Sequence, residues 1–190
     1  MSSSESAWDA AARQRLLGLA RASVEHGLRE GEPLPVDEAH YPPALRALRA
    51  AFVTLRLRGD LRGCTGTLEA VHPLVVEVAR TAHRSAFRDP RFQPLERSEL
   101  AELAFHISIL SPLEPLEVES EAGLLARLRP GVDGLVLREG SLTGTFLPAV
   151  WSHLPSPENF VRELKRKAGL PLDHWSATLV LQRYTVDEIG

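Results

Sequence analysis

The single cysteine of the chain, Cys64, lies in a short run of residues that could support chemistry. Arg62 stands two positions before it, and Gly63 and Gly66 flank it. A nearby cation favours the thiolate, which is the nucleophilic form of cysteine. Glycine inside a strand often marks a bulge or a place where another group approaches the backbone closely. The run therefore predicts a site at Cys64 and Arg62. The alternative is that the cysteine is a small buried hydrophobe and the arginine reaches solvent.

Other residues could complete such a site if the fold brings them together. Cys64, His83 and Asp89 are the residue types of a thiol nucleophile, a base and a group that orients the base. Arg62 and Arg91 offer fixed positive charge for a small carboxylate or phosphate, and lysines could add to this charge. Arg91 could instead pair with Asp89. The remaining binding candidates are Lys165, Lys167 and Trp151.

Metal and cofactor signals are weak in this sequence. The seven histidines include no close pair at ligand spacing, and a lone cysteine provides no Cys-x-x-Cys motif. Gly59, Gly63 and Gly66 do not precede a helix as the glycines of a phosphate-binding loop do. We therefore expect no metal and no cofactor.

A β-hairpin should position Cys64. Residues 51–58 are rich in β-branched and apolar types, and Gly59-Asp60 predicts a two-residue turn before residues 61–68. In that register Leu55 pairs with Cys64. Alternation would then place Cys64 and Arg62 on the apolar face that includes Val53 and Leu55.

The remaining pattern predicts an α+β fold. Helical periodicity covers residues 6–28, 73–87, 119–128 and 157–168, with shorter helical turns at 44–50 and from Ser98. Strands are predicted at 104–110 and 177–186, and a second hairpin at 134–147 turns at Gly140-Ser141. With no βαβ regularity, about five or more strands favour a mostly antiparallel sheet flanked by helices.

Length and composition fit one domain over residues 5–190. The 190 residues are 44% hydrophobic and 25% charged, which is typical of a soluble globular protein. The net charge of −3 disfavours nucleic-acid binding, although the face of the 157–168 helix with Arg162, Lys165, Arg166 and Lys167 leaves it as an alternative. The start of the chain has no apolar signal core, and no apolar run reaches membrane-spanning length. We expect a cytoplasmic protein without membrane contact.

Several motifs give the chain a family resemblance over about residues 13–186. They are Leu61-Arg62-Gly63-Cys64-x-Gly66-Thr67, Ala86-Phe87-x-Asp89-Pro90-Arg91-Phe92-x-Pro94-Leu95, Leu110-Ser111-Pro112-x-Glu114-Pro115, Gly131-x-Asp133-Gly134-Leu135, Thr145-Phe146-Leu147-Pro148-x-Val150-Trp151, Lys165-x-Lys167-Ala168-Gly169-Leu170-Pro171 and Trp175. With these motifs the chain resembles the AMMECR-one family, protein A of the AmmeMemoRadiSam system. It departs from the family pattern at Thr65, where the motif has isoleucine, and at Ala149, where glutamine or glutamate is expected.

The resemblance implies an α+β fold with a larger and a smaller lobe around a cleft. It also implies two partners, a Memo-like protein and a radical SAM enzyme, but no defined reaction. Three functions stay open. The first is an accessory or substrate-presenting protein with a cleft around Cys64, and the second is an enzyme that uses Cys64 and Arg62 on a small anionic substrate. The third is an RNA-binding protein.

Overall fold

The computed structural model describes residues 8–190. The chain divides into two compact units, one formed by the residues up to Leu110 with Asp187–Gly190 and the other by Ser111–Val186. Each unit has its own four-stranded sheet and hydrophobic core. The α+β class is confirmed, with the strands divided between two sheets. The expected domain start at residue 5 and helix start at Ser6 lie outside the described residues.

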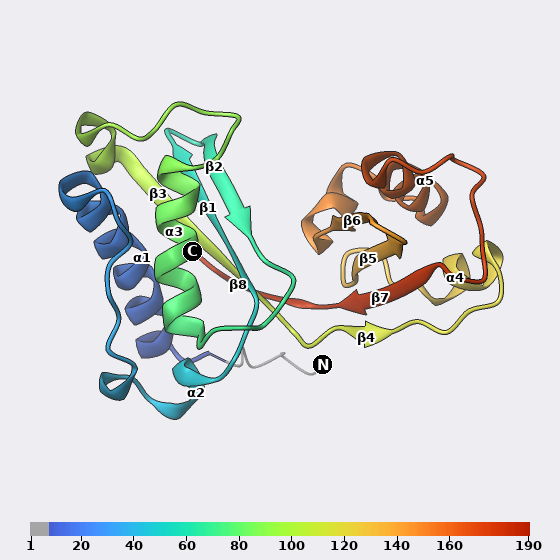
Figure 1. Ribbon diagram of the computed structural model, residues 1–190, viewed down its shortest axis with the longest axis horizontal. Coiled ribbons are helices and arrows are strands. Elements are labelled where there is room, and N and C mark those ends of the chain that lie inside the picture. Colours follow the sequence, from blue (N-terminus) through green and yellow to red (C-terminus); the bar gives the residue numbers. More distant parts are fainter. Residues whose placement is uncertain (1–7) are drawn as a thin grey trace. The chain divides into compact units, whose positions relative to one another are not determined.

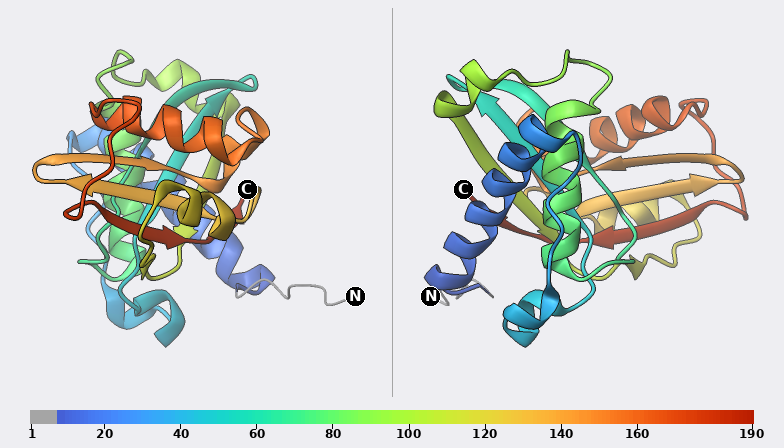
Figure 2. Two further views of the ribbon diagram at one scale, coloured as in Figure 1. Left: turned by 90° about the vertical axis from the view of Figure 1, so that its right-hand side faces the viewer. Right: turned by 60° about the vertical axis from the view of Figure 1, so that its left-hand side comes forward.

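The first unit packs two long helices against one face of a sheet with the order β2-β1-β3-β8 (Figure 1). Helices α1 and α3 lie side by side (Figure 2), and the buried Ser23 hydroxyl of α1 donates a 2.7 Å hydrogen bond to the Ala79 carbonyl of α3. Sheet and helices bury one core. The elements are α1 (Ala10–Glu30), η1 (Glu38–His40), α2 (Pro43–Arg46), β1 (Ala51–Leu57), β2 (Asp60–Gly66), α3 (Leu74–Phe87), η2 (Arg97–Glu102), β3 (Leu103–Leu110) and β8 (Val186–Ile189).

The predicted register of the first hairpin is wrong by one residue. Cys64 pairs with Thr54, not with Leu55. The turn is formed by Arg58 and Gly59, which both have positive φ (54° and 92°), so it begins one residue earlier than the Gly59-Asp60 turn. A bulge beside Leu55 then changes the pairing again. Because side chains alternate between faces, the shift moves Cys64 off the core face.

The second unit is built on a sheet with the order β4-β7-β5-β6. Its predicted hairpin is confirmed: Glu139 pairs with Leu142 and Leu135 with Phe146, around Gly140 at φ 57°. Helix α5 has the predicted range 157–168: Ser156 caps its start, and it ends at Gly169 in the left-handed conformation. The elements are β4 (Glu114–Pro115), α4 (Glu121–Arg127), β5 (Gly134–Glu139), β6 (Leu142–Phe146), η3 (Pro148–Ser152), α5 (Pro157–Ala168) and β7 (Val180–Tyr184).

The last predicted strand, residues 177–186, differs most from the structure. It is two strands, β7 in the second sheet and β8 in the first, with Thr185 between them. The chain thus returns to the first unit at its end, and Ser111–Val186 form an insertion between β3 and β8. Alternation continues through both strands, so the sequence pattern does not show the change of sheet.

Candidate functional site

Cys64 lies on the sheet face opposite α3. It is a free cysteine and a partly exposed residue, and the Thr54 hydroxyl donates a 3.2 Å hydrogen bond to its Sγ. Thr54 also pairs with His106 on β3, so Cys64, Thr54 and His106 form one row across three strands. The row contains a thiol, a hydroxyl and an imidazole. The sequence had predicted apolar neighbours for Cys64 instead.

The backbone of Cys64 is held by two side chains at the outer edge of the sheet. Strand β2 is an edge strand, and there the Asp89 carboxylate accepts the Cys64 N–H at 2.9 Å. Arg91 donates to the Cys64 carbonyl at 3.0 Å and to both Asp89 oxygens at 3.0 and 2.7 Å. This Asp89–Arg91 clamp satisfies the peptide groups that an edge strand otherwise leaves open.

The charge state of the clamp follows from its geometry. The Asp89 side chain is only 3% exposed, which by itself would favour the neutral acid. The Arg91 guanidinium is the larger influence, and together with the Cys64 N–H it holds the pKa of Asp89 well below its usual range. Asp89 is therefore ionised at neutral pH. It pairs with Arg91, as the alternative interpretation of the sequence had it.

Arg62 forms an ion pair with an acidic residue that is distant in sequence. Its Nε donates to Glu99 Oε1 at 2.6 Å and its Nη2 to Glu99 Oε2 at 2.9 Å. This pairing lowers the pKa of Glu99. The guanidinium also lies 5.9 Å from the centre of the Phe92 ring, and its buried Nη1 has no hydrogen-bond partner among the described residues. Arg62 thus joins β2 to η2, and most of its charge is neutralised.

At the two glycines near Cys64, other protein atoms occupy the space that a side chain would need. A Cβ on Gly63 would overlap the backbone oxygen of Ser85 in α3, and a Cβ on Gly66 would overlap the Phe52 ring. The expectation that these glycines leave the backbone open to a ligand is therefore wrong. They allow a helix and an aromatic ring to approach β2 closely.

Thr65 has a structural explanation. Its N–H donates to the Ser85 hydroxyl at 3.0 Å, and its own hydroxyl lies 2.9 Å from the same oxygen. Ser85 in turn donates to the Val53 carbonyl at 2.8 Å. A threonine at this position thus joins a hydrogen-bonded connection between α3, β2 and β1, which an isoleucine could not do.

The dispersed Cys64, His83 and Asp89 do not form a triad. His83 lies on the face of α3 that packs against α1, where its Nε2 is 3.2 Å from the Gly31 carbonyl and its ring lies beside Phe87. Burial is the main cause that lowers its pKa. Asp89 contacts the backbone of Cys64 and the Arg91 side chain instead. The histidine that shares a sheet face with the thiol is His106, which alternation along 104–110 would have shown in the correct register.

The candidates in the second unit make internal contacts. Lys165 is completely buried, and its Nζ donates to Glu121 at 2.6 Å and to the Leu172 carbonyl at 3.1 Å. Lys167 donates to the Thr145 carbonyl at 2.9 Å, above the Phe146 ring. Trp151 is buried, stacks on a phenylalanine ring and donates to the Asp133 carbonyl at 2.6 Å. These contacts hold the second unit together.

The second departure from the family pattern, Ala149, lies on the surface. Ala149 is exposed in η3, so the polar residue expected there would extend into solvent.

Among residues 8–190, no three histidine, cysteine or acidic side chains group together as metal ligands. Over the same range, no helix has the length and apolar character needed to cross a bilayer.

Comparison with known proteins decides the ancestry. The model of the AMMECR1 (AMMECR-one) family matches residues 17–189. The chain belongs to the AMMECR1 family. The match spans both compact units, so the family domain includes the insertion between β3 and β8.

Individual AMMECR1 relatives agree with this assignment. The crystal structure of uncharacterised protein PH0010 from Pyrococcus horikoshii has a TM-score of 0.83 and 31% identity, covering 92% of this chain and 88% of that one. A protein of Methanothermobacter thermautotrophicus is 40% identical over 161 residues, which are 83% of this chain and 82% of the relative. Protein MJ0810 of Methanocaldococcus jannaschii is 34% identical over 165 residues, 83% of this chain and 79% of the relative. Their names describe no activity, so family membership establishes ancestry and fold.

Proposed function

We propose that this AMMECR1 protein is an accessory component that presents Cys64 to partner proteins, a Memo-like protein and a radical SAM enzyme. The observation that carries the proposal is the Asp89–Arg91 clamp. It fixes the Cys64 backbone through a buried carboxylate, and Cys64 is a partly exposed residue on the sheet face. A rigidly held, accessible group suits recognition by a partner, because little conformational freedom is lost on binding.

The enzyme alternative has less support. It needs a free cation beside the thiol, whereas Arg62 is paired with Glu99 and Arg91 with Asp89. The RNA-binding alternative is weakened in the same way. On α5, Arg162 and Arg166 both contact Glu163, and Lys165 is buried.

The single cysteine makes the proposal directly testable. A thiol-specific photo-crosslinker should attach to native protein at neutral pH at Cys64 alone. The labelled protein, mixed with the Memo-like and radical SAM proteins of the same organism, should form a crosslink to one of them. Co-purification at native expression levels should recover the same partner.

A matched control moves the cysteine to an exposed position. The double variant Cys64→Ser/Ser98→Cys has one reactive thiol on η2 and should label equally well but capture no partner. If neither partner is recovered by crosslinking or by co-purification, the proposal is wrong. Equal capture from position 98 would also contradict it, because contact would then not be centred on Cys64.

A further inference from the structure

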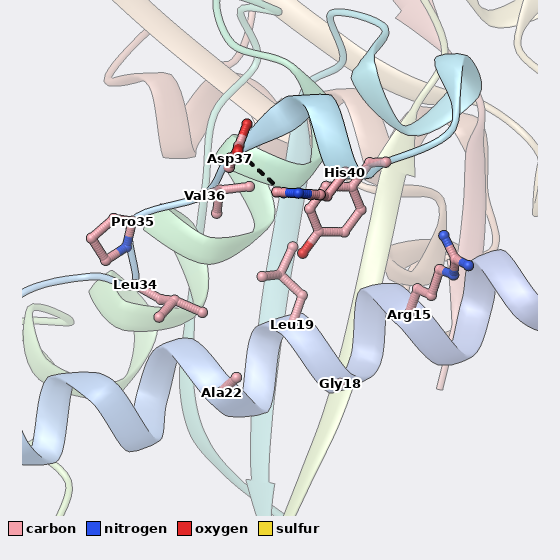
Figure 3. Close-up of a pocket in the computed structure, with 10 residues that line it drawn as sticks. Arg15, Gly18, Leu19, Ala22, Leu34, Pro35, Val36, Asp37 and His40 are labelled. Carbon is pink, nitrogen blue, oxygen red and sulfur yellow. Dashed lines mark ion pairs between the residues drawn. The ribbon is translucent and has the colours of Figure 1, made fainter.

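Two hollows lie along α1, in the first unit. One, of about 510 Å³, lies between α1 and the segment 34–41 (Figure 3). The other, of about 530 Å³, lies farther toward the start of the helix and includes Phe105. Both are lined by Gly18, and neither is lined by Cys64 or Arg62. Gly18 is thus the point that the two hollows share.

Gly18 has no structural requirement of its own. Glycine is the least favourable residue after proline in a helix interior. Gly27, in the same helix, is explained by packing, because the Phe87 and His83 side chains occupy the place of its Cβ. At Gly18 nothing lies within 4 Å of a Cβ, and the residue is not among those with positive φ. Its effect is to leave open space above the helix at the one residue that both hollows share.

The lining combines an apolar floor with positive charge. Leu19, Leu34 and Val36 provide the apolar surface (Figure 3), and Tyr41 is a further lining residue. Arg15 lines the first hollow, and Arg13 and Arg21 line the second. The one acid among these lining residues is Asp37, which lies in the first hollow 3.1 Å from His40. Arg21 donates to the carbonyls of Leu100 and Leu103 at 3.1 and 2.9 Å, and among the described residues no carboxylate pairs with it.

We propose that the hollow between α1 and the segment 34–41 binds a small amphipathic anion. An alkyl or aryl group would lie on Leu19, Leu34 and Val36, and its carboxylate, sulfonate or phosphate would be attracted by Arg15 at the helix surface. Ligand pockets are commonly about 300–1,000 Å³ and mostly apolar with a few polar groups, which agrees with this hollow. The site is separate from Cys64, so it stands whether or not the proposed partner role is correct.

The test uses the full chain and the fluorescent probe 8-anilinonaphthalene-1-sulfonate, which has an apolar body and one negative charge. Native protein should bind it saturably, and more tightly than its neutral analogue N-phenyl-1-naphthylamine. Gly18→Leu should weaken binding by about tenfold or more, because leucine fills the space. Arg15→Gln should weaken it about threefold to tenfold, as expected for one partly exposed charge.

Two controls separate a filled site from a damaged protein. Gly18→Leu and Gly18→Ala should both raise the melting temperature, because each removes a glycine from a helix interior. Arg29→Gln changes the same charge on the same helix outside the hollows and should bind the probe as native protein does. Unchanged binding in Gly18→Leu, equal loss in Arg29→Gln, or tighter binding of the neutral analogue would each overturn the proposal.

Discussion

At the scale of single residues, the charged side chains around Cys64 act through their partners. Asp89 is the central one, because it accepts hydrogen bonds from the Cys64 N–H, from the Arg91 N–H and from the Arg91 side chain. A buried carboxylate with these donors is stable only while it is ionised. The position of Cys64 therefore depends on the charge of a residue 25 positions away.

Asp89→Asn should reveal this dependence. The substitution keeps the shape but removes the charge, and we expect a loss of about 2–3 kcal/mol in unfolding free energy at pH 7. Because Arg91 lowers the pKa of Asp89 in the folded state, the stabilisation is complete above the unfolded pKa of about 4 and is lost progressively as the pH falls from there through the lowered folded-state pKa. Urea unfolding at pH 7 and pH 3 measures it. The gap between native protein and variant should narrow at pH 3, and a constant gap would contradict the assignment.

Glu102→Gln provides the comparison. Glu102 forms a similar two-bond pair with Arg58, but both side chains are exposed, at 48% and 73%. Exposed pairs contribute little to stability because water screens them. We therefore expect no measurable change for this variant in the same urea titrations.

At the scale of elements, the close packing of α3 on β2 determines where Cys64 lies. The backbone of Ser85 occupies the place of a side chain at Gly63, and its hydroxyl links Thr65 to Val53. Helix and edge strand are thus joined at a distance that only glycine permits.

Gly63→Ala should therefore be strongly destabilising. Its methyl group would overlap a backbone oxygen, which cannot rotate away as a flexible side chain can. We expect a loss of about 3 kcal/mol in unfolding free energy. Gly18→Ala is the matched substitution in open space and should instead gain about 1 kcal/mol. Denaturant unfolding of both variants tests the pair, and equal effects would show that the packing at Gly63 is looser than the structure indicates.

At the scale of the whole chain, the first unit is completed only by the last residues. Ile189 is 1% exposed in its core, Glu188 accepts a 2.8 Å hydrogen bond from Ser108, and Asp187 accepts one from Trp8 at 3.2 Å. The last strand of this sheet, β8, therefore cannot be added until the insertion Ser111–Val186 has been synthesised. Contacts so distant in sequence are slow to form, because a long loop must close first.

Ile189→Ala tests this arrangement. Removing the buried side chain should cost about 2–4 kcal/mol through lost burial and the cavity that remains. We expect hydrogen exchange to show faster amide exchange in β1 and β3 of the first unit. Exchange in β5 and β7, which belong to the other unit, should change less. Equal acceleration in both sheets would contradict two separate cores.

The sequence by itself determined the elements whose signals are local. Helix α5 has the predicted range 157–168, with Ser156 and Pro157 at its start and Gly169 at its end. The hairpin of residues 134–147 has the turn and register that Gly140-Ser141 predicted. These succeed because caps and glycine turns depend on neighbouring residues only. The motifs also indicated the AMMECR1 family, which the match of the family model to residues 17–189 confirmed.

Only the tertiary structure decided the surroundings of Cys64. The register changed because Arg58 adopts a positive φ and a bulge follows, neither of which residue types indicate. The partner of Arg62, Glu99, is 37 residues away and on another element. The pairing of a charge depends on which segments pack together, and that depends on the burial of the whole core. Sequence could therefore identify Cys64 as a candidate, whereas only the fold showed which of its neighbours remain free to act.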